Sequence, residues 1–431
     1  MKPDRTRPPR IRDFSHLNLP VPTTEKGQNG ITIHFIETGT SPCSNVSVVW
    51  NYGAMHSSKL SAADFVPEMM LQGTKTMTGE QIVDRLDYYG TFITNSVSAS
   101  HTKMEWTALN EFMPGIFELM SAIFLDPTFP AEPFEALKRK RLMAFDLGMT
   151  QTKTIASRKL KELLAGLGHP YIRPVERHQI AELNITDIEN AWADGIHTAP
   201  IDIFVTGMLD ENIKESTGLF AEKLAEARKP YISTEREPKL PTPFLPEAPT
   251  TLKVEMPETK QSSVMIGIPA IPRSHPDYIL LRITVVALGG YFGSRLMTSV
   301  REELGLTYGI YAYLAGSPEG SAIHIAADCD SSNVDSVLEA INHQMQRLAN
   351  ELMDHDELNR LKSYYTTNLA STLESFKTIS DYYETQLTLN LAADYFERQQ
   401  TEIRTITPER IRQVARQYFK TDLERTVIAG K

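Results

Sequence analysis

The chain has 431 residues, of which 41% are hydrophobic and 23% are charged. These proportions are typical of a globular protein of a few domains and exclude a disordered chain, a collagen-like chain and a small disulfide-rich scaffold. With 44 basic and 54 acidic side chains the formal net charge is −10, which disfavours binding to nucleic acid or to anionic lipid.

The first 14 residues are basic but lack the apolar core of a secretory signal. No apolar run approaches the ~18–20 residues that a membrane-spanning helix requires. The two cysteines, Cys43 and Cys329, are too far apart in the sequence for a Cys-x-x-Cys zinc or redox motif. We therefore expect a chain that starts near Met1 and stays in the reducing cytoplasm without contacting a membrane.

The first half of the chain predicts strands followed by helices. Alternating or continuous β-type runs predict strands over 31–37 and 44–53, a helix over 61–71, a second β region over 91–100 and 103–109, and long helices over 113–125 and 132–145. Thr78 precedes a Gly-Glu-Gln sequence and predicts a helix start by side-chain capping. The run from Lys138 to Arg141 is the strongest basic cluster, and we interpret it as a solvated helix face.

The segment 229–251 contains six prolines, and proline removes a backbone donor and fixes φ. This segment therefore predicts an extended linker. The elements that follow repeat the order of the first half: strands over 251–256 and 262–270, a helix over 276–290, strands over 306–314 and 321–329, and helices over 334–352 and 355–373. Thr407 predicts a further helix start.

This repetition predicts a duplicated domain. We expect an α+β fold of two homologous halves, each an antiparallel sheet with helices packed on one face. The predicted organisation is an N-terminal half over residues 1–228, a Pro-rich linker over 229–251 and a C-terminal half over 252–431.

Local motifs for an autonomous active site are missing from the sequence. There is no Gly-x-x-x-x-Gly-Lys-Ser/Thr loop, no Gly-x-Ser-x-Gly elbow, and neither His-Glu-x-x-His nor His-x-x-Glu-His. The glycine-rich stretch 289–294 lacks a lysine and is interpreted as a helix interruption. The eleven histidines are scattered, and we interpret His101 and His169 as structural residues. A hydrolase that uses side chains distant in sequence stays open as a minor alternative, because catalytic groups are brought together in space.

The most specific motif is the stretch 294–308, with Ser-Arg-Leu, then Val-Arg-Glu, then Gly-Leu-x-Tyr. This pattern resembles the pitrilysin/insulinase-like zinc metallopeptidase superfamily, which includes the mitochondrial processing peptidases. Three further segments are similar to the family: Gln72-Gly73-Thr74 after a helix, the strand 90–95 ending in Asn95, and Leu167-Gly168-His169-Pro170-Tyr171. The resemblance covers about residues 30–430 and implies the family's duplicated two-half fold.

The chain departs from the family at the zinc motif. The resemblance places the two histidine ligands at Asp64 and Glu68, and the general base at Pro67. A zinc peptidase needs ligands that hold the ion and a base that takes a proton from its water, and proline has no acid–base group. Between residues 136 and 161, where the third ligand is expected, Asp146 is the only carboxylate. Two carboxylates at i,i+4 would suit Mg²⁺ or Ca²⁺ better than zinc. We nevertheless expect Asp64 and Glu68 to be ordinary surface or interface carboxylates. The prediction is therefore that this chain binds no metal.

The resemblance also implies retained residues in the second half. Arg301 and Tyr308 match the spacing of an Arg/Tyr pair that contacts the scissile peptide in the family. The local sequence predicts a helix over 294–304, its end at Gly305, and a strand that starts near Tyr308. The turn would bring together two hydrogen-bond donors suited to a peptide carbonyl.

The predicted function follows from this combination. The chain resembles the subunit of a heterodimeric zinc peptidase that lacks the metal, supplying Arg301 and Tyr308 to a site whose zinc comes from a homologous partner subunit. It is expected to be inactive alone, with a peptide as the shared substrate. The alternative is a catalytically silent structural subunit of a larger assembly. Asn95 is a weaker candidate for peptide binding along a strand edge.

Overall fold

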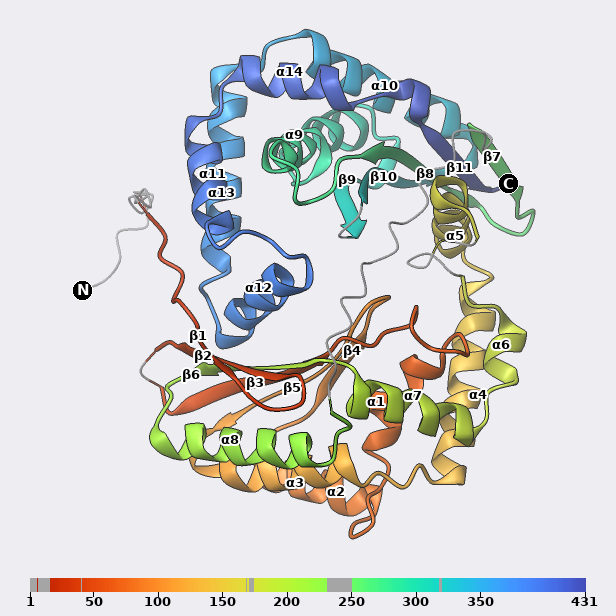
Figure 1. The fold of residues 1–431 in the computed structure, drawn as a ribbon. Coiled ribbons are helices and arrows are strands. Elements are labelled where there is room, and N and C mark those ends of the chain that lie inside the picture. Colours follow the sequence, from red (N-terminus) through yellow and green to blue (C-terminus); the bar gives the residue numbers. More distant parts are fainter. Residues whose placement is uncertain are drawn as a thin grey trace.

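The first half is built on a six-stranded sheet in the order β1-β2-β6-β3-β5-β4. The computed structural model describes Thr6, residues 16–39, 41–167, His169, and residues 174–230, 250–317 and 320–431 (Figure 1). Strands β2, β3 and β6 are buried along almost their whole length, which explains why they read as apolar runs. The strands are β1 (Thr23–Lys26), β2 (Ile31–Glu37), β3 (Cys43–Trp50), β4 (Thr94–Val97), β5 (Thr102–Leu109) and β6 (Ile201–Gly207).

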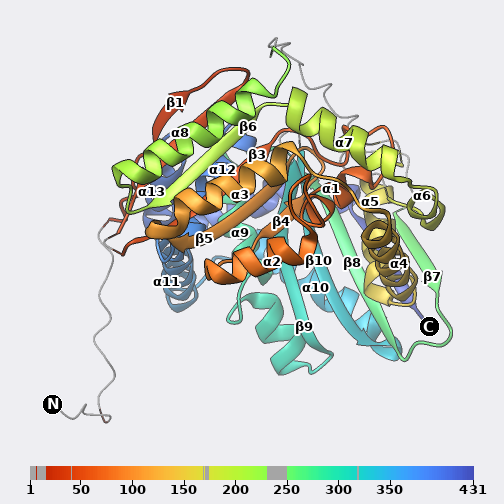
Figure 2. The same cartoon turned by 90° about the horizontal axis from the view of Figure 1, so that it is seen from below.

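Helices cover the outer face of this sheet. Figures 1 and 2 show α3 and α8 side by side across it, and Trp106, Phe117, Phe124 and Phe220 pack between the layers. The helices are α1 (Ala62–Met70), α2 (Gly79–Tyr88), α3 (Met113–Leu125), α4 (Ala131–Gly148), α6 (Arg177–Ala181), α7 (Ile185–Thr198) and α8 (Glu211–Glu226). The predicted strands and helices of this half are confirmed, whereas β1, β6, α6, α7 and α8 were not predicted.

The second half is built on a five-stranded sheet in the order β7-β11-β8-β10-β9. Its strands are β7 (Thr251–Glu255), β8 (Gln261–Ala270), β9 (Thr307–Ser317), β10 (Gly320–Asp330) and β11 (Arg425–Gly430). Its helices are α9 (Tyr278–Gly289), a π-helix (Met297–Glu303), α10 (Val334–Asn350), α11 (His355–Ser371), α13 (Tyr395–Thr405) and α14 (Pro408–Tyr418). Short 3₁₀ turns lie at Asn110–Phe112, Ser331–Asn333 and Thr421–Leu423.

The two sheets share one topology, which confirms the predicted duplication. Strands β2-β6-β3-β5-β4 of the first sheet correspond in order to β7-β11-β8-β10-β9 of the second, and β1 is an addition. In both sheets the first pair, β2–β6 or β7–β11, is parallel and the remaining pairs are antiparallel. The predicted α+β class is confirmed, and the sheets differ from the prediction in this one parallel pair.

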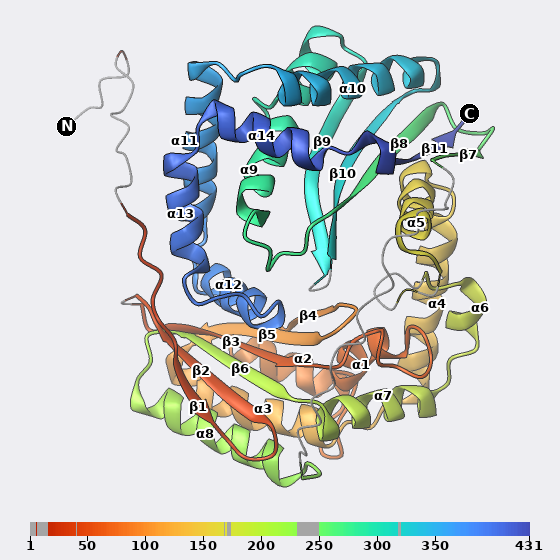
Figure 3. The same cartoon turned by 45° about the horizontal axis from the view of Figure 1, so that its top comes forward.

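The halves exchange a helix with each other. Helix α5 (Thr152–Ala165) belongs to the first half in sequence but packs on the inner face of the second sheet, where Leu160 and Leu164 contact Met265 and Val427. A side chain at Gly267 would collide with Leu164, so glycine there permits the close approach. Conversely, α12 (Phe376–Thr388) of the second half packs on β3 and β6 of the first sheet (Figures 1 and 3). Each sheet is therefore covered on one face by helices of its own half, as predicted, and on part of its other face by the helix received from the other half.

The predicted helix ends are confirmed by their backbone and capping contacts. Thr78 accepts a hydrogen bond from the backbone N–H of Gln81, and the Gln81 side chain accepts one from Thr78 N–H, which completes a capping box. Thr407 caps α14 in the same position. Gly305 has φ +62°, a left-handed conformation that glycine adopts without strain and that ends the helical segment as predicted.

Two sequence predictions fall largely on residues outside the described part of the chain. The proposed linker lies almost entirely outside the described residues, as does most of the 167–171 motif. Cys43 and Cys329 are both free thiols. Across the described residues, no helix combines the length and the apolar character needed to cross a membrane.

A partly buried histidine in the second half is expected to make its stability depend on pH. The His324 imidazole is stacked on Tyr313, with ring centroids 5.2 Å apart, and burial followed by the nearby Lys161 lowers its pKa to about 4. The folded-state pKa thus lies below the unfolded value of about 6.5, so the neutral ring stabilises the fold above pH 6.5 and that contribution is lost as the pH falls toward 4.

We expect His324→Gln to flatten the fall of stability between pH 6.5 and 4, by up to about 1.4 kcal/mol per pH unit. Urea unfolding at a series of pH values measures this slope. His343→Gln, at an exposed histidine on α10, is the matched control. Parallel slopes for His324→Gln and the unmodified chain would contradict the prediction.

Candidate functional site

The positions that the family resemblance assigns to zinc ligands lie on α1. Asp64 and Glu68 are half-buried, and Pro67 is buried inside the helix, where it cannot donate a backbone hydrogen bond. Burial raises the pKa of Asp64, although Arg141 and a hydrogen bond from Ser61 act in the opposite direction. These carboxylates therefore lie at the contact between α1 and its neighbours.

A guanidinium from α4 lies against this carboxylate pair. Arg141 Nη2 donates a hydrogen bond to Glu68 Oε1, and its Cζ lies 5.9 Å from the centre of the Phe65 ring. Lys140 Nζ is 4.0 Å from the other Glu68 oxygen. The α1–α4 link is thus an ion pair in this chain, with a fixed positive charge beside Asp64 and Glu68.

The basic run on α4 differs from its prediction as a solvated face. Arg139 and Lys140 are exposed, as predicted. Lys138 Nζ donates 2.8 Å to the backbone oxygen of Leu183, and Arg141 pairs with Glu68. The prediction was wrong for these two residues because sequence spacing on one helix does not show which neighbouring helix covers it. Asp146, the only carboxylate in the region of the expected third ligand, accepts a hydrogen bond from Arg177 Nε at 2.8 Å.

Arg301 and Tyr308 are brought together at the end of the π-helix. Leu304 N–H donates to Ser299 oxygen and Leu306 N–H to Val300 oxygen, wide turns that lead the chain through Gly305 into β9. Arg301 Cζ lies 5.1 Å from the centre of the Tyr308 ring. The predicted convergence of guanidinium and phenol is confirmed as geometry.

A third side chain, which the sequence analysis missed, completes this corner. Phe292 follows the glycine pair that ends α9, and its ring centre lies 4.6 Å from Arg301 Cζ. The guanidinium is therefore held against two aromatic rings. Tyr308 is 90% exposed and Phe292 is 61% exposed. The glycine-rich stretch 289–294 was the available signal, but glycine spacing alone does not show which side chain a turn presents.

Asn95 lies on β4, the edge strand of the first sheet. β4 pairs with β5, where Asn95 is opposite Met104, and the Asn95 side chain is exposed. Among the described residues, the other edge of β4 has no strand partner, which is the arrangement that strand addition requires. Its duplicate in the second sheet is β9, which carries Tyr308.

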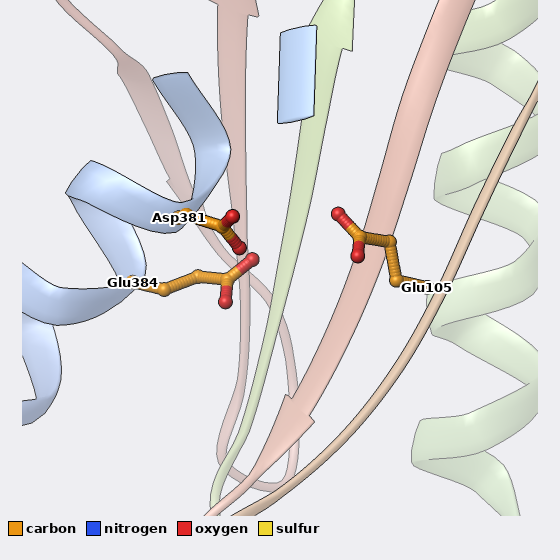
Figure 4. A group of neighbouring side chains, drawn as sticks. All are labelled: Glu105, Asp381 and Glu384. Carbon is orange, nitrogen blue, oxygen red and sulfur yellow. The ribbon is translucent and has the colours of Figure 1, made fainter. Parts of the chain in front are cut away.

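One group of carboxylates brings its oxygens within 4.8 Å of one another in the described part of the chain: Glu105 of β5 with Asp381 and Glu384 of α12 (Figure 4). Two ammonium groups sit among them. Lys103 Nζ is 2.7 Å from Asp381 and 2.9 Å from Glu384, and Lys377 Nζ is 2.5 Å from Glu105. The cluster is therefore an ion-pair network between the halves, with its carboxylates already matched by cations.

The electrostatics of Lys103 reflect this role. Burial by itself would lower the Lys103 pKa, but Glu384, Asp381 and Glu105 together outweigh burial and raise it well above its usual range. The ammonium is thus charged throughout the physiological range, and α12 is held to β5 by charge as well as by packing.

A hydroxyl–imidazole–carboxylate row also crosses three strands of the first sheet. Thr24 Oγ1 lies 3.1 Å from His34 Nδ1, and His34 Nε2 lies 2.9 Å from Asp202 Oδ1. His34 is buried and stacked on Phe204, with ring centroids 4.5 Å apart. Because Thr24 is the register partner of His34, the row follows from strand pairing, and we interpret it as a link that fixes β1 to the sheet.

Comparisons with known proteins agree with this architecture. Residues 33–165 match the family described as insulinase (peptidase family M16), and residues 183–365 match the peptidase M16 inactive domain. A Bacillus subtilis protein named as the uncharacterized zinc protease YmxG is 23% identical over 416 residues, 93% of this chain and 97% of that protein.

Two solved structures share the fold. The peptidase M16 inactive domain from Pseudomonas fluorescens superposes with a TM-score of 0.84 at 20% identity, covering 95% of this chain and 98% of that one. The periplasmic protease PqqL from Escherichia coli has a TM-score of 0.74 at 16% identity, and the match covers 97% of this chain but 47% of PqqL. With a duplicated sheet topology, a match of residues 33–165 to the insulinase family and a match of residues 183–365 to the M16 inactive domain, the chain belongs to the M16 peptidase family.

Proposed function

We propose that this chain is the subunit of a two-subunit peptidase that does not hold the metal, and that it binds the scissile peptide through Arg301 and Tyr308. The observation that carries the proposal is the pairing of these side chains, with the Arg301 guanidinium held between the rings of Phe292 and Tyr308. Both offer N–H or O–H donors to a peptide carbonyl and to the oxyanion formed when that carbonyl is attacked.

The composition of α1 supports assigning the metal to another chain. The three positions that would supply two ligands and a base hold Asp64, Pro67 and Glu68, and Arg141 places a positive charge beside the carboxylates. A nearby cation opposes the binding of a second one. In this proposal the zinc and the general base belong to a homologous partner subunit, and this chain contributes donors to the reaction.

Two further observations support a two-chain assembly. The match to PqqL covers 97% of this chain but 47% of PqqL, so two chains of this size correspond in length to one PqqL chain. Tyr308 and Phe292 are large side chains that are mostly exposed at one corner, as expected for residues that meet a substrate or a second subunit. The free thiols of Cys43 and Cys329 are consistent with a cytoplasmic assembly.

A silent structural subunit is the second candidate. The match of residues 183–365 to an inactive M16 domain favours it. In such a subunit, the packing of the Arg301 guanidinium on the Phe292 ring would contribute to stability alone. The two candidates differ in whether substitution at Arg301 and Tyr308 changes turnover.

The first test uses the chain alone and in complex. We expect the purified chain to contain no stoichiometric zinc by elemental analysis and to leave an unfolded peptide uncut. Addition of an M16 subunit that carries His-x-x-Glu-His, from the same genome, should produce zinc-dependent cleavage above that of the added subunit alone. Zinc-dependent cleavage by the isolated chain, or a complex no more active than the added subunit, would reject the proposal.

A further inference from the structure

A small pocket in the second half has neither Arg301 nor Tyr308 in its lining. It is formed between α9, α11 and β9, and Figure 3 shows α9 lying between α11 and β9. Its volume is about 230 Å³, below the ~300–1,000 Å³ of most small-molecule sites. Most of its lining is apolar or aromatic, including Val285, Leu314, Tyr313 and Tyr364, and the polar lining is Arg282 and Asn368.

Arg282 is the unusual member of this lining. Among the described residues, its guanidinium makes one side-chain hydrogen bond, from Nη1 to Gln399 Oε1 at 3.3 Å, and its Cζ lies 5.9 Å from the centre of the Tyr365 ring. Within the part of the chain that the structure describes, no carboxylate oxygen lies within 4.0 Å of it. The groups that surround the charge are phenols and an amide, none of which is an anion at neutral pH.

Arg295 has the carboxylate partner that Arg282 lacks among the described residues. Arg295, which is also half-buried, donates from Nε and Nη2 to the two oxygens of Glu357 at 2.7 and 3.0 Å. This two-bond geometry is the one that the planar guanidinium prefers. Arg282 has the same planar guanidinium, but its charge has no carboxylate partner among the described residues. The apolar walls of the pocket exclude much of the water that would otherwise screen this charge.

We propose that this pocket binds a carboxylate attached to a small apolar group, with the guanidinium of Arg282 as its counter-ion. The apolar walls formed by α9 and β9 would take the hydrophobic part of the ligand, and the exposed Asn368 amide could donate at the entrance. A free apolar acid and the C-terminal residue of a peptide both present this chemistry. The site uses neither Arg301 nor Tyr308, so it goes beyond the proposed function and does not depend on it.

The test compares a carboxylate with its uncharged amide. N-acetylphenylalanine and N-acetylphenylalaninamide are titrated into the full-length chain by calorimetry. We expect saturable binding of the acid and about 10–100-fold weaker binding of the amide, the range expected when a charge-assisted hydrogen bond is lost. Equal binding of acid and amide, or no saturable binding of the acid at millimolar concentration, would overturn the proposal.

Variants then assign the effect to the pocket. Arg282→Met should lower the affinity for the acid to that for the amide. Arg282→Lys should give an intermediate affinity, because lysine keeps the positive charge but not the planar guanidinium that can donate two parallel hydrogen bonds. Arg273→Met is the matched control, since Arg273 stacks on Tyr395 at 5.5 Å and does not line the pocket. If Arg282→Met does not fold, the acid–amide comparison and the lysine variant still decide.

A third arm separates the two sources of the ligand. An octapeptide that ends in phenylalanine with a free carboxylate is compared with the same octapeptide amidated. Tighter binding of the free-ended octapeptide than of N-acetylphenylalanine supports a peptide terminus as the natural ligand. Binding of the small acid but not of the octapeptide supports a free acid. Unchanged affinity for the acid in Arg282→Met would again overturn the proposal.

Discussion

Substitution of Arg301 by alanine together with Tyr308 by phenylalanine is expected to lower the turnover of the two-subunit complex by about 10²–10³-fold, the loss seen when oxyanion donors are removed from an active site. The guanidinium and the phenolic hydroxyl are the groups removed, whereas the Tyr308 ring remains. Because Tyr308 is 90% exposed, the phenylalanine substitution should not disturb the core. The measurement is cleavage of an unfolded peptide at saturating substrate, with complex formation checked by gel filtration.

Two neighbouring substitutions serve as controls. Tyr311→Phe removes a hydroxyl from an exposed tyrosine on the same strand, and Glu302→Ala removes an exposed charge from the same π-helix. Both should leave turnover within about twofold of the unmodified complex. Full activity of the double variant would favour the silent structural subunit over the catalytic one.

Lys103→Met is expected to lower the free energy of unfolding by about 3–5 kcal/mol, the cost of removing one partner from a buried ion-pair network. The ammonium contacts carboxylates of both halves, and Glu105 and Glu384 are buried. Without it, three carboxylates would share the single charge of Lys377. Urea unfolding measures the loss, and hydrogen exchange along α12 shows whether this helix separates from β5 first.

Lys377→Met is the comparison for this variant. The Lys377 side chain is 52% exposed, so water screens its interactions, and we expect a cost of about 1 kcal/mol or less. Similar small losses for Lys103→Met and Lys377→Met would mean that the network contributes little to the attachment of α12.

Local signals in the sequence predicted most of the fold. The apolar runs of β2 and β8, the capping threonines Thr78 and Thr407, and the terminating Gly305 each act within a few residues of their own position. The order of these elements was sufficient to predict the duplication. The interior strands β6 and β11 were missed because each follows a series of helices, so that no neighbouring strand in the sequence marks it.

Contacts between distant segments could not be predicted. Lys103 and Asp381 are 278 residues apart, and Arg141 and Glu68 are 73 residues apart. In the sequence each of these side chains is an ordinary charge on a strand or helix. The Arg301–Tyr308 contact was predicted from the family resemblance, supported by the single turn that separates the two residues. Arg282 gave no signal, since an unmatched charge is visible only after its surroundings are known.

The exchange of α5 and α12 has a consequence for how the molecule can be divided. A fragment that ends after α8 would contain α5 without Met265 and Val427, which bury it, and would leave Ile36, Val49 and Phe204 without Ile379. We expect that neither this fragment nor the complementary C-terminal fragment is stable and soluble alone. When the two fragments are co-expressed, they should associate and restore the native fold. We therefore expect the protein to tolerate cutting or lengthening of the chain between the two halves, because the exchanged helices α5 and α12 would hold the halves together without it.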